Sequence, residues 1–253
     1  MNRIRIIFLL FAMFFTASSF AQGNYAGGVD DQNLHFGFNF QYITTEYKIQ
    51  RASNWRSPYF EEGVKVTDSL QSIRSIVNPG FGIGFVSDVY ITPNLNIRFT
   101  PGLVFSDRVV DYEFADGASY DQLGVQSPEG FTRRTVSSTM VEFPLGIKLK
   151  SDRRNNFRAY LLAGAKYGID VATKKVAEDK GELAVNKFLK NNKSILSYEV
   201  AIGFDLYLEY FKLTPELKLS NSFKSVLRKE DQPYANPIEK MYLRNFVFSL
   251  YFE

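Results

Sequence analysis

The feature that most limits the fold of this chain is an alternation of apolar and polar residues, which recurs about eight times between residues 34 and 252. It is clearest over residues 197–209, where large apolar side chains occupy every second position from Tyr198 to Leu208 and the positions between them include Glu199 and Asp205. Successive side chains of a strand point to opposite faces, whereas a helix repeats about every 3.6 residues. The pattern therefore predicts an all-β fold of eight strands.

The connections between these segments alternate in length. Short turns follow the second, fourth and sixth segments, and long polar stretches lie at residues 45–78, 107–137, 170–194 and 221–241. Short turns on one rim and long loops on the other are typical of outer-membrane β-barrels, whose short turns face the periplasm and whose long loops face outward. An even number of antiparallel strands also places both ends of the barrel on the short-turn rim.

Two kinds of barrel produce such alternation, and the number of aromatic residues separates them. A soluble lipocalin-type barrel buries its apolar face inside and needs a well-solvated outer face. This chain contains 24 Phe and 15 Tyr, more than the narrow interior of an eight-stranded barrel can hold. The apolar faces fit a lipid-facing belt instead. We expect an eight-stranded antiparallel transmembrane β-barrel of the outer membrane, surrounded by outer-membrane lipid.

The first residues indicate how such a protein reaches that membrane. Two arginines precede an apolar run, and small residues end at Ala21. These are the parts of a cleaved secretory signal peptide, and the apolar run is short for a transmembrane anchor. We expect a signal peptide at residues 1–21, a periplasmic N-terminal segment at 22–33, and an outer-membrane β-barrel with four long loops at 34–253.

The faces opposite the apolar ones carry charged residues of both signs. If the apolar faces contact lipid, these residues point into the lumen, where a charge in a low dielectric needs a partner. Six acidic and six basic residues fall on these faces, so the two signs balance. We expect a salt-bridged, filled lumen, with a passive pore as the alternative. The expected lumen network is Asp88, Arg98, Glu142, Lys148, Arg158, Lys166, Glu199, Asp205, Glu209, Lys212, Glu216 and Lys218.

Pro144 and Pro215 fall inside two of the expected strands. Proline has no N–H to donate to a ladder hydrogen bond, so within sheets it is confined largely to edges and bulges. We expect bulges or local irregularity at both positions.

Composition argues against catalysis, cofactors and nucleic acid. The chain has no Cys and a single His, His35, which removes thiolate chemistry and multi-His metal sites. His35 lies within an alternating segment and is expected to form a hydrogen bond in the lumen. The net charge of +3 comes from 30 basic and 27 acidic residues spread along the chain, which does not predict a nucleic-acid-binding surface. We expect a protein that is not an enzyme and has no cofactor or metal; no small-molecule substrate is evident. An outer-membrane enzyme is the third class considered.

The first long loop contains a cluster that forms a candidate partner patch: Trp55, Arg56, Tyr59 and Phe60. Trp, Tyr and Arg are enriched at the energetic centres of protein interfaces. The same residues would suit packing over the barrel mouth, and the sequence leaves the two readings open. In the second loop Arg133 and Arg134 are expected to face solvent or lipopolysaccharide. In the third, residues 174–193 have room for a short amphipathic helix, which Gly181 disfavours.

Several runs of residues resemble the PorT family of Bacteroidota outer-membrane barrels, over about residues 77–220 and the closing strand. The similar residues are Val77 to Gly84, Asn96 to Leu103, Val141 to Leu145, Arg153, Asn155, Asn156, Arg158, Tyr160, Gly164 to Tyr167 and Asp170. The resemblance implies a component required for the type IX secretion system, which exports proteins with a C-terminal sorting domain and supports gliding motility in gliding species. It implies other secretion-system proteins as partners and carries over no catalytic residue. The alternatives are a small passive porin and a ligand-binding outer-membrane protein.

Overall fold

The computed structural model describes residues 33–120, 130–172 and 183–253. The predicted signal peptide, residues 1–21, and all but the last residue of the predicted periplasmic segment lie outside these ranges. Among the described residues, no helix combines the length and the apolar character needed to cross a membrane.

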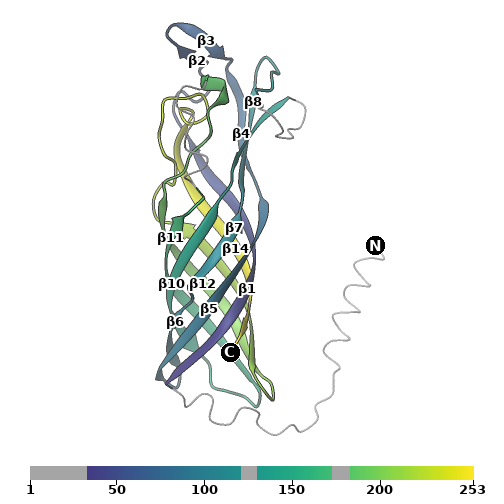
Figure 1. The fold of residues 1–253 in the computed structure, drawn as a ribbon, viewed down its shortest axis with the longest axis vertical. Coiled ribbons are helices and arrows are strands. Elements are labelled where there is room, and N and C mark those ends of the chain that lie inside the picture. Colours follow the sequence, from purple (N-terminus) through teal and green to yellow (C-terminus); the bar gives the residue numbers. More distant parts are fainter. Residues whose placement is uncertain (1–32, 121–129, 173–182) are drawn as a thin grey trace, which may run out of the picture.

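A closed ring of antiparallel strands forms the body of the protein (Figure 1). β1 closes the ring, because it pairs with β14 on one side and with β5 on the other. β6 and β7 share one position, because each pairs with both β5 and β10. The ring thus has eight positions, and the predicted barrel is confirmed. Its strands are β1 (Leu34–Arg51), β5 (Asn78–Thr92), β6 (Leu95–Phe99), β7 (Gly102–Ser106), β10 (Thr139–Lys150), β11 (Phe157–Asp170), β12 (Ser194–Tyr207), β13 (Lys212–Ser222) and β14 (Ile238–Phe252).

Prolines explain where the ladders are interrupted. β6 and β7 are separated at Thr100 and Pro101, beside Pro144 of β10, and neither proline has an N–H to donate. The register is the same on both sides of this break. The β12–β13 ladder is also interrupted beside Pro215 without a change of register. The expected local irregularity is therefore found at both prolines as interrupted pairing without bulges; register shifts occur near the ends of β1 and β5.

The long loops contain more regular structure than the sequence predicted. Three strands, β4, β8 and β9, form a sheet that rises from the long-loop rim, and β2 and β3 form a hairpin beyond it (Figure 1). We call these parts together the extension. Its elements are β2 (Tyr59–Glu61), β3 (Val64–Thr67), β4 (Leu70–Ile76), β8 (Arg108–Phe114), β9 (Phe131–Val136) and the 3-10 turn η2 (Ala184–Asn186). η2 lies within residues 174–193, where the sequence has room for a short helix; residues 174–182 of that stretch are outside the described residues.

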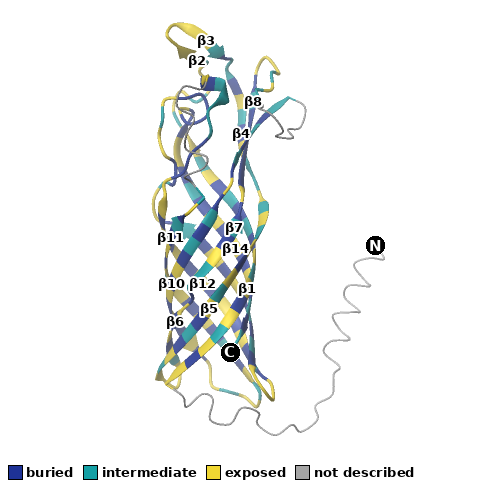
Figure 2. Cartoon of the chain, in the orientation of Figure 1, coloured by how far each residue is buried: buried dark blue, intermediate teal, exposed yellow. Residues whose placement is uncertain are grey.

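Exposed and buried residues alternate along the barrel wall (Figure 2). Most exposed positions over the lipid-facing part of the wall are apolar, whereas the buried positions are mixed. From Leu34 to Tyr42 the outward positions of β1 are Leu, Phe or Tyr, and all of them are exposed. Beyond Tyr42 the outward positions are polar and include Glu46 and Lys48. Arg244 of β14, which is also outward, lies 3.4 Å from Glu46 at this level. The change of character marks the outer edge of the apolar belt.

Two kinds of residue fill the interior. Toward the short-turn rim the inward side chains are mainly charged residues and tyrosines, whereas toward the long-loop rim an apolar cluster lies beside polar residues such as Glu142 and Asp170. Ile43, Val104 and Met140 of the barrel belong to the same buried apolar cluster as Leu70 and Tyr112 of the extension. The barrel interior and the extension therefore share one continuous core.

Gly203 of β12 makes room for a buried ring. It is paired with Tyr160 of β11, and a Cβ at this position would lie 2.7 Å from Cε1 of that ring, far inside contact distance. Tyr160 is buried and has no route to solvent. We expect Gly203→Ala to lower the free energy of unfolding by about 1–3 kcal/mol, the usual cost of overpacking an interior. A urea titration, read from the mobility difference between folded and unfolded protein on a denaturing gel, measures this loss.

A double-mutant cycle provides the control. In a Tyr160→Ala background the added methyl group has space, so the same substitution should cost less than about 0.5 kcal/mol. An equal cost in both backgrounds would show that the Tyr160 ring does not require a glycine at this position.

Candidate functional site

Arg98 of β6 is the centre of the interior polar network. Its guanidinium donates to Asp88 at 2.7 and 3.2 Å and to Glu253 at 2.7 Å. Nη1 also donates to the hydroxyl of Tyr160 at 3.3 Å and lies 3.7 Å from Glu216. The Arg98 side chain is 2% exposed, so protein groups and not bulk water neutralise its charge. A planar guanidinium suits this position because its several N–H groups serve different acceptors at once.

Lys148 of β10 extends the network across the lumen. Its Nζ donates to both carboxylate oxygens of Asp205 at 2.8 and 2.9 Å and lies 3.6 Å from Asp88. The hydroxyl of Thr214 also donates to Asp205, at 2.9 Å. Asp88 therefore bridges the two cations Arg98 and Lys148.

A second group of contacts surrounds Glu216 of β13. Its carboxylate accepts hydrogen bonds from the hydroxyls of Tyr160 and Tyr251 at 2.7 and 2.9 Å. Lys218 lies 3.3 Å from Glu216 and 3.3 Å from Glu199. Tyr160 thus links this group to Arg98, and the network joins strands on opposite sides of the barrel.

Two further ion pairs flank this centre. Lys212 pairs with Glu253, the same residue that Arg98 contacts. Lys166 pairs with Glu142 at 2.9 Å on the neighbouring strands β11 and β10. Charges of opposite sign are therefore placed together along the interior.

The sequence placed most, but not all, of this set correctly. Eleven of the twelve predicted lumen residues are buried in the interior, including Arg158, which lies opposite Asp205 in the β11–β12 ladder. Glu209 is an error: it lies in the turn after β12 and is exposed. The alternation continues through residue 209 in the sequence, but β12 ends at Tyr207, so the side of the wall can no longer be inferred from the spacing.

The sequence missed the neutral members of the network. Tyr160 and Tyr251 occupy inward positions, but no role was inferred for their hydroxyls. The available signal was an inward tyrosine among charged positions, because a buried tyrosine hydroxyl usually finds a partner. Which carboxylate accepts the hydrogen bond of that hydroxyl depends on strands that are distant in the chain.

Arg134 of β9 ties the long loops together. Its guanidinium donates to the carbonyl oxygens of Tyr120 at 2.9 Å and of Val185 at 2.7 Å, and it stacks on the ring of Tyr234 at 4.1 Å. These partners belong to the second, third and fourth long loops. The expectation that Arg134 faces solvent or lipopolysaccharide is wrong, because its side chain is buried. The sequence did not reveal the carbonyl oxygens that accept its hydrogen bonds.

A buried tyrosine also connects β8 to the fourth long loop. The hydroxyl of Tyr112 in β8 donates to the carbonyl oxygen of Tyr234 at 2.8 Å. Burial raises the pKa of Tyr112 well above its ordinary value, so the hydroxyl stays protonated and remains a donor at neutral pH. Arg133 pairs with Asp111 at 2.8 Å on the side of the same sheet.

The candidate partner patch divides into packed and exposed residues. Trp55 packs against the apolar core, with the guanidinium groups of Arg51 and Arg56 at 4.5 and 4.9 Å from its ring. Phe60 of β2 is 56% exposed, and Arg56 is exposed as well. Only part of the patch is therefore presented to solvent.

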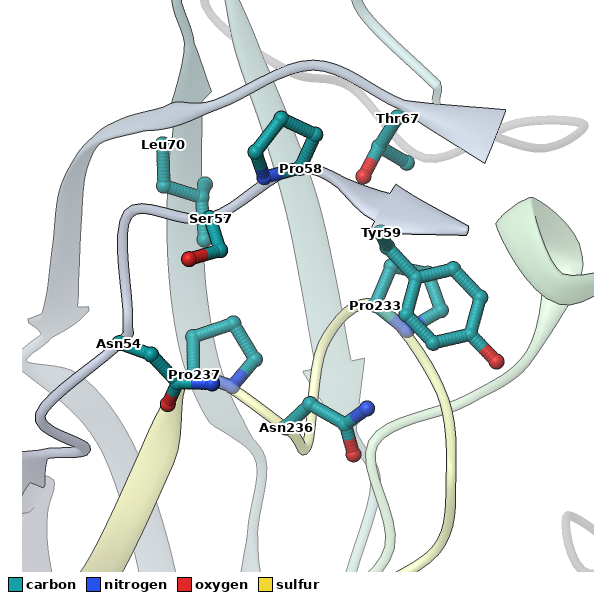
Figure 3. A pocket seen from close by; sticks show the side chains of 9 residues that line it. All are labelled: Asn54, Ser57, Pro58, Tyr59, Thr67, Leu70, Pro233, Asn236 and Pro237. Atoms are coloured by element: carbon teal, nitrogen blue, oxygen red, sulfur yellow. The ribbon is translucent and has the colours of Figure 1, made fainter. Parts of the chain in front are cut away.

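Tyr59 faces a small cavity between the first and fourth loops, shown in Figure 3. The cavity has a volume of about 80 Å³, and Pro58, Pro233 and Pro237 contribute to its lining. The Tyr59 hydroxyl donates to the carbonyl oxygen of Asp231 at 3.3 Å. Burial, followed by the nearby charges of Asp231 and Glu61, raises the pKa of Tyr59, which keeps this donor protonated.

The closed ring, the lipid-facing belt and the filled interior define an outer-membrane β-barrel. The chain belongs to the family described as outer membrane protein beta-barrel domain, whose model matches residues 15–228. Its location is the outer membrane.

Similar solved structures include three outer-membrane proteins. OprG from Pseudomonas aeruginosa is 12% identical, with 85% of this chain and 93% of OprG covered and a TM-score of 0.40. Ail of Yersinia pestis is 8% identical, with 87% and 99% covered and a TM-score of 0.37. Neisserial surface protein A is 9% identical, with 87% and 98% covered and a TM-score of 0.36. No curated protein matches the sequence significantly.

Removing the central cation tests whether the network stabilises the barrel. We expect Arg98→Met to lower the free energy of unfolding by about 3–5 kcal/mol, because it leaves buried carboxylates without a counter-charge. Urea unfolding of the full chain in lipid vesicles measures the change. Arg154→Met is the matched control, since Arg154 is exposed in the β10–β11 turn and its loss should shift stability by no more than about 0.5 kcal/mol. Equal stability of the two variants would contradict a stabilising network.

Proposed function

We propose that this protein is a non-enzymatic, non-conducting outer-membrane barrel that acts through its exposed loops as a component of protein secretion. The observation that carries the proposal is the interior, which is filled with paired charges at one level and with an apolar core at the next. A barrel filled in this way has its contact surface on its loops and outer wall.

The filled interior argues against a passive porin. A solute pathway needs a continuous polar channel, whereas Ile43, Val104 and Met140 are each at most 3% exposed above the charged level. Below them Arg98 and Lys148 are held by carboxylates from opposite sides of the lumen. Opening a path would require breaking buried ion pairs, each at a cost of several kcal/mol.

The exposed tip of the extension supports a protein partner. Phe60 and Val64 of the β2–β3 hairpin are 56% and 68% exposed, and Arg56 is exposed nearby. Exposed apolar patches rimmed by polar residues mark sites of interaction, and arginine is enriched among the residues that contribute most to binding. We propose this group as the contact surface for a secretion partner.

The resemblance to the PorT family supports type IX secretion as the process. Under this proposal the cargo carries a C-terminal sorting domain, and gliding motility depends on the same component in species that glide. No enzyme activity is required of the barrel in this role.

Conductance distinguishes the proposal from the passive porin. The full chain in planar bilayers should show no steady single-channel openings, because the lumen is occupied at two levels. Resistance of the inserted barrel to added protease, in vesicles from the same preparation, controls for insertion. Steady openings from inserted protein would support the porin and reject a closed lumen.

Export of cargo tests the proposed process. Deleting the chain should abolish release of cargo with a C-terminal sorting domain, and the wild-type chain should restore it. A His35→Ala form should restore it equally, since no catalytic base is proposed. A Phe60→Ser and Val64→Ser double variant should restore export poorly while reaching the outer membrane in normal amount.

A matched pair of exposed lipid-facing residues provides the control for that double variant. Leu161→Ala and Ile202→Ala remove similar apolar surface from the wall and should leave export unchanged. Normal export in the deletion strain would reject the secretion role. Normal export with the hairpin variant alone would reject this contact surface.

A further inference from the structure

A cavity opens on the outer wall where β11, β12 and β13 reach the long-loop rim, and its volume is about 470 Å³. Its membrane side is formed by Tyr167, Leu196 and Phe223, one from each of three adjacent chain segments. Tyr167 is paired with Leu196, and the N–H of Phe223 donates to the carbonyl oxygen of Leu196 at 3.0 Å. All three side chains are exposed, so an apolar surface continues from the lipid belt into the cavity.

The opposite side of the cavity carries two lysines. Lys193 and Lys224 both line it and are exposed. Their segments are held side by side, because Asn192 donates from its backbone N–H to Val226 at 2.8 Å and from its side chain to Ser225 at 3.2 Å. Within the described part of the chain neither lysine forms an ion pair.

Two carboxylates of the adjoining segments do not offset this positive charge. Asp170 is buried on the inner side, where it accepts a hydrogen bond from Ser138 at 2.7 Å. Glu230 of the fourth loop pairs with Lys190 at 2.9 Å and with Arg228 at 3.1 Å. No acidic residue lines the cavity among the described residues.

The adjoining part of the rim, on β14 and β1, differs in charge. There Lys48 and Lys240 are exposed, but Glu46 and Arg244 form an ion pair at 3.4 Å beside them, closer to the apolar belt. Charges there are mixed, whereas at the cavity they are of one sign. The cavity therefore combines an apolar side toward the membrane with a cationic side away from it.

We propose that this cavity binds lipid A, the phosphorylated lipid of the outer leaflet. Lys193 and Lys224 contact a phosphate group, which ammonium groups bind through charge-assisted hydrogen bonds. Leu196 and Phe223 pack along the upper part of an acyl chain. The site lies at the outer edge of the apolar belt on the long-loop side, which is the depth and the leaflet where lipid A places its phosphates.

Native mass spectrometry of the full chain in detergent, titrated with bisphosphorylated lipid A, tests the site. The wild-type chain should retain lipid A, and a Lys193→Gln and Lys224→Gln double variant should bind it on the order of tenfold more weakly, given the usual effect of two basic residues at an anionic lipid surface. Lys48→Gln and Lys240→Gln remove the same charge from the adjoining rim on β1 and β14 and should change binding by less than about twofold. The gel mobility shift of each variant shows that it is folded.

Three further probes identify the ligand. Lipid A stripped of its phosphates should bind as weakly as the Lys193 and Lys224 double variant binds intact lipid A. Millimolar inorganic phosphate should not displace lipid A, because it lacks the apolar contacts, and neither should polyglutamate. Displacement by phosphate would identify a free-anion site, and displacement by polyglutamate an acidic protein site; either would overturn the proposal. Equal losses in the two double variants would also overturn it, since they would show diffuse charge attraction.

Discussion

The structure depends on the pairing of charges inside a narrow barrel. An isolated charge in a low-dielectric interior costs several kcal/mol, so each inward Lys or Arg needs a carboxylate close by. Arg98 meets this need with Asp88 from its hairpin partner β5 and with Glu253 and Glu216 from the other end of the chain. The same contacts hold distant strands at fixed positions, so the network determines both that the ring closes and that its lumen is occupied.

The apolar core above the network has a different origin. Loops that cross the mouth of a barrel must satisfy their own backbone groups and bury their apolar side chains. Here β4, β8 and β9 satisfy the backbone groups by pairing with one another, and Leu70, Ile73 and Tyr112 join the inward side chains of the barrel. Arg134 donates hydrogen bonds to carbonyl oxygens of two separate loops. The extension is consequently continuous with the barrel and not attached to it by linkers.

The sequence predicts what depends on spacing and misses what depends on distant partners. Alternation identified the eight strand positions and grouped eleven charged residues on one face, because the two faces of a strand follow from geometry. The number of aromatic residues then indicated that this face points inward. The prediction failed at Glu209, because β12 ends at Tyr207 whereas the alternation in the sequence continues through residue 209. It also failed at Arg134, whose burial depends on the carbonyl groups of Tyr120 and Val185 in other loops. Pairings such as that of Tyr160 with Glu216 require the closed ring, which no local pattern contains.

The continuity of the core constrains how the outer surface can work. The β2–β3 hairpin stands beyond the extension, and the basic cavity lies at the rim beside the lipid belt. Switching between two arrangements requires an element with two comparable packings. Between these two surfaces the structure instead has one core. In it Tyr112 and Tyr234 are fully buried, and the Tyr112 hydroxyl donates a hydrogen bond to the carbonyl oxygen of Tyr234. Under the proposed function the barrel therefore presents the exposed β2–β3 hairpin to its partner without changing shape. Lipid contacts fix the depth of the wall, and the core holds the hairpin at a constant position above it.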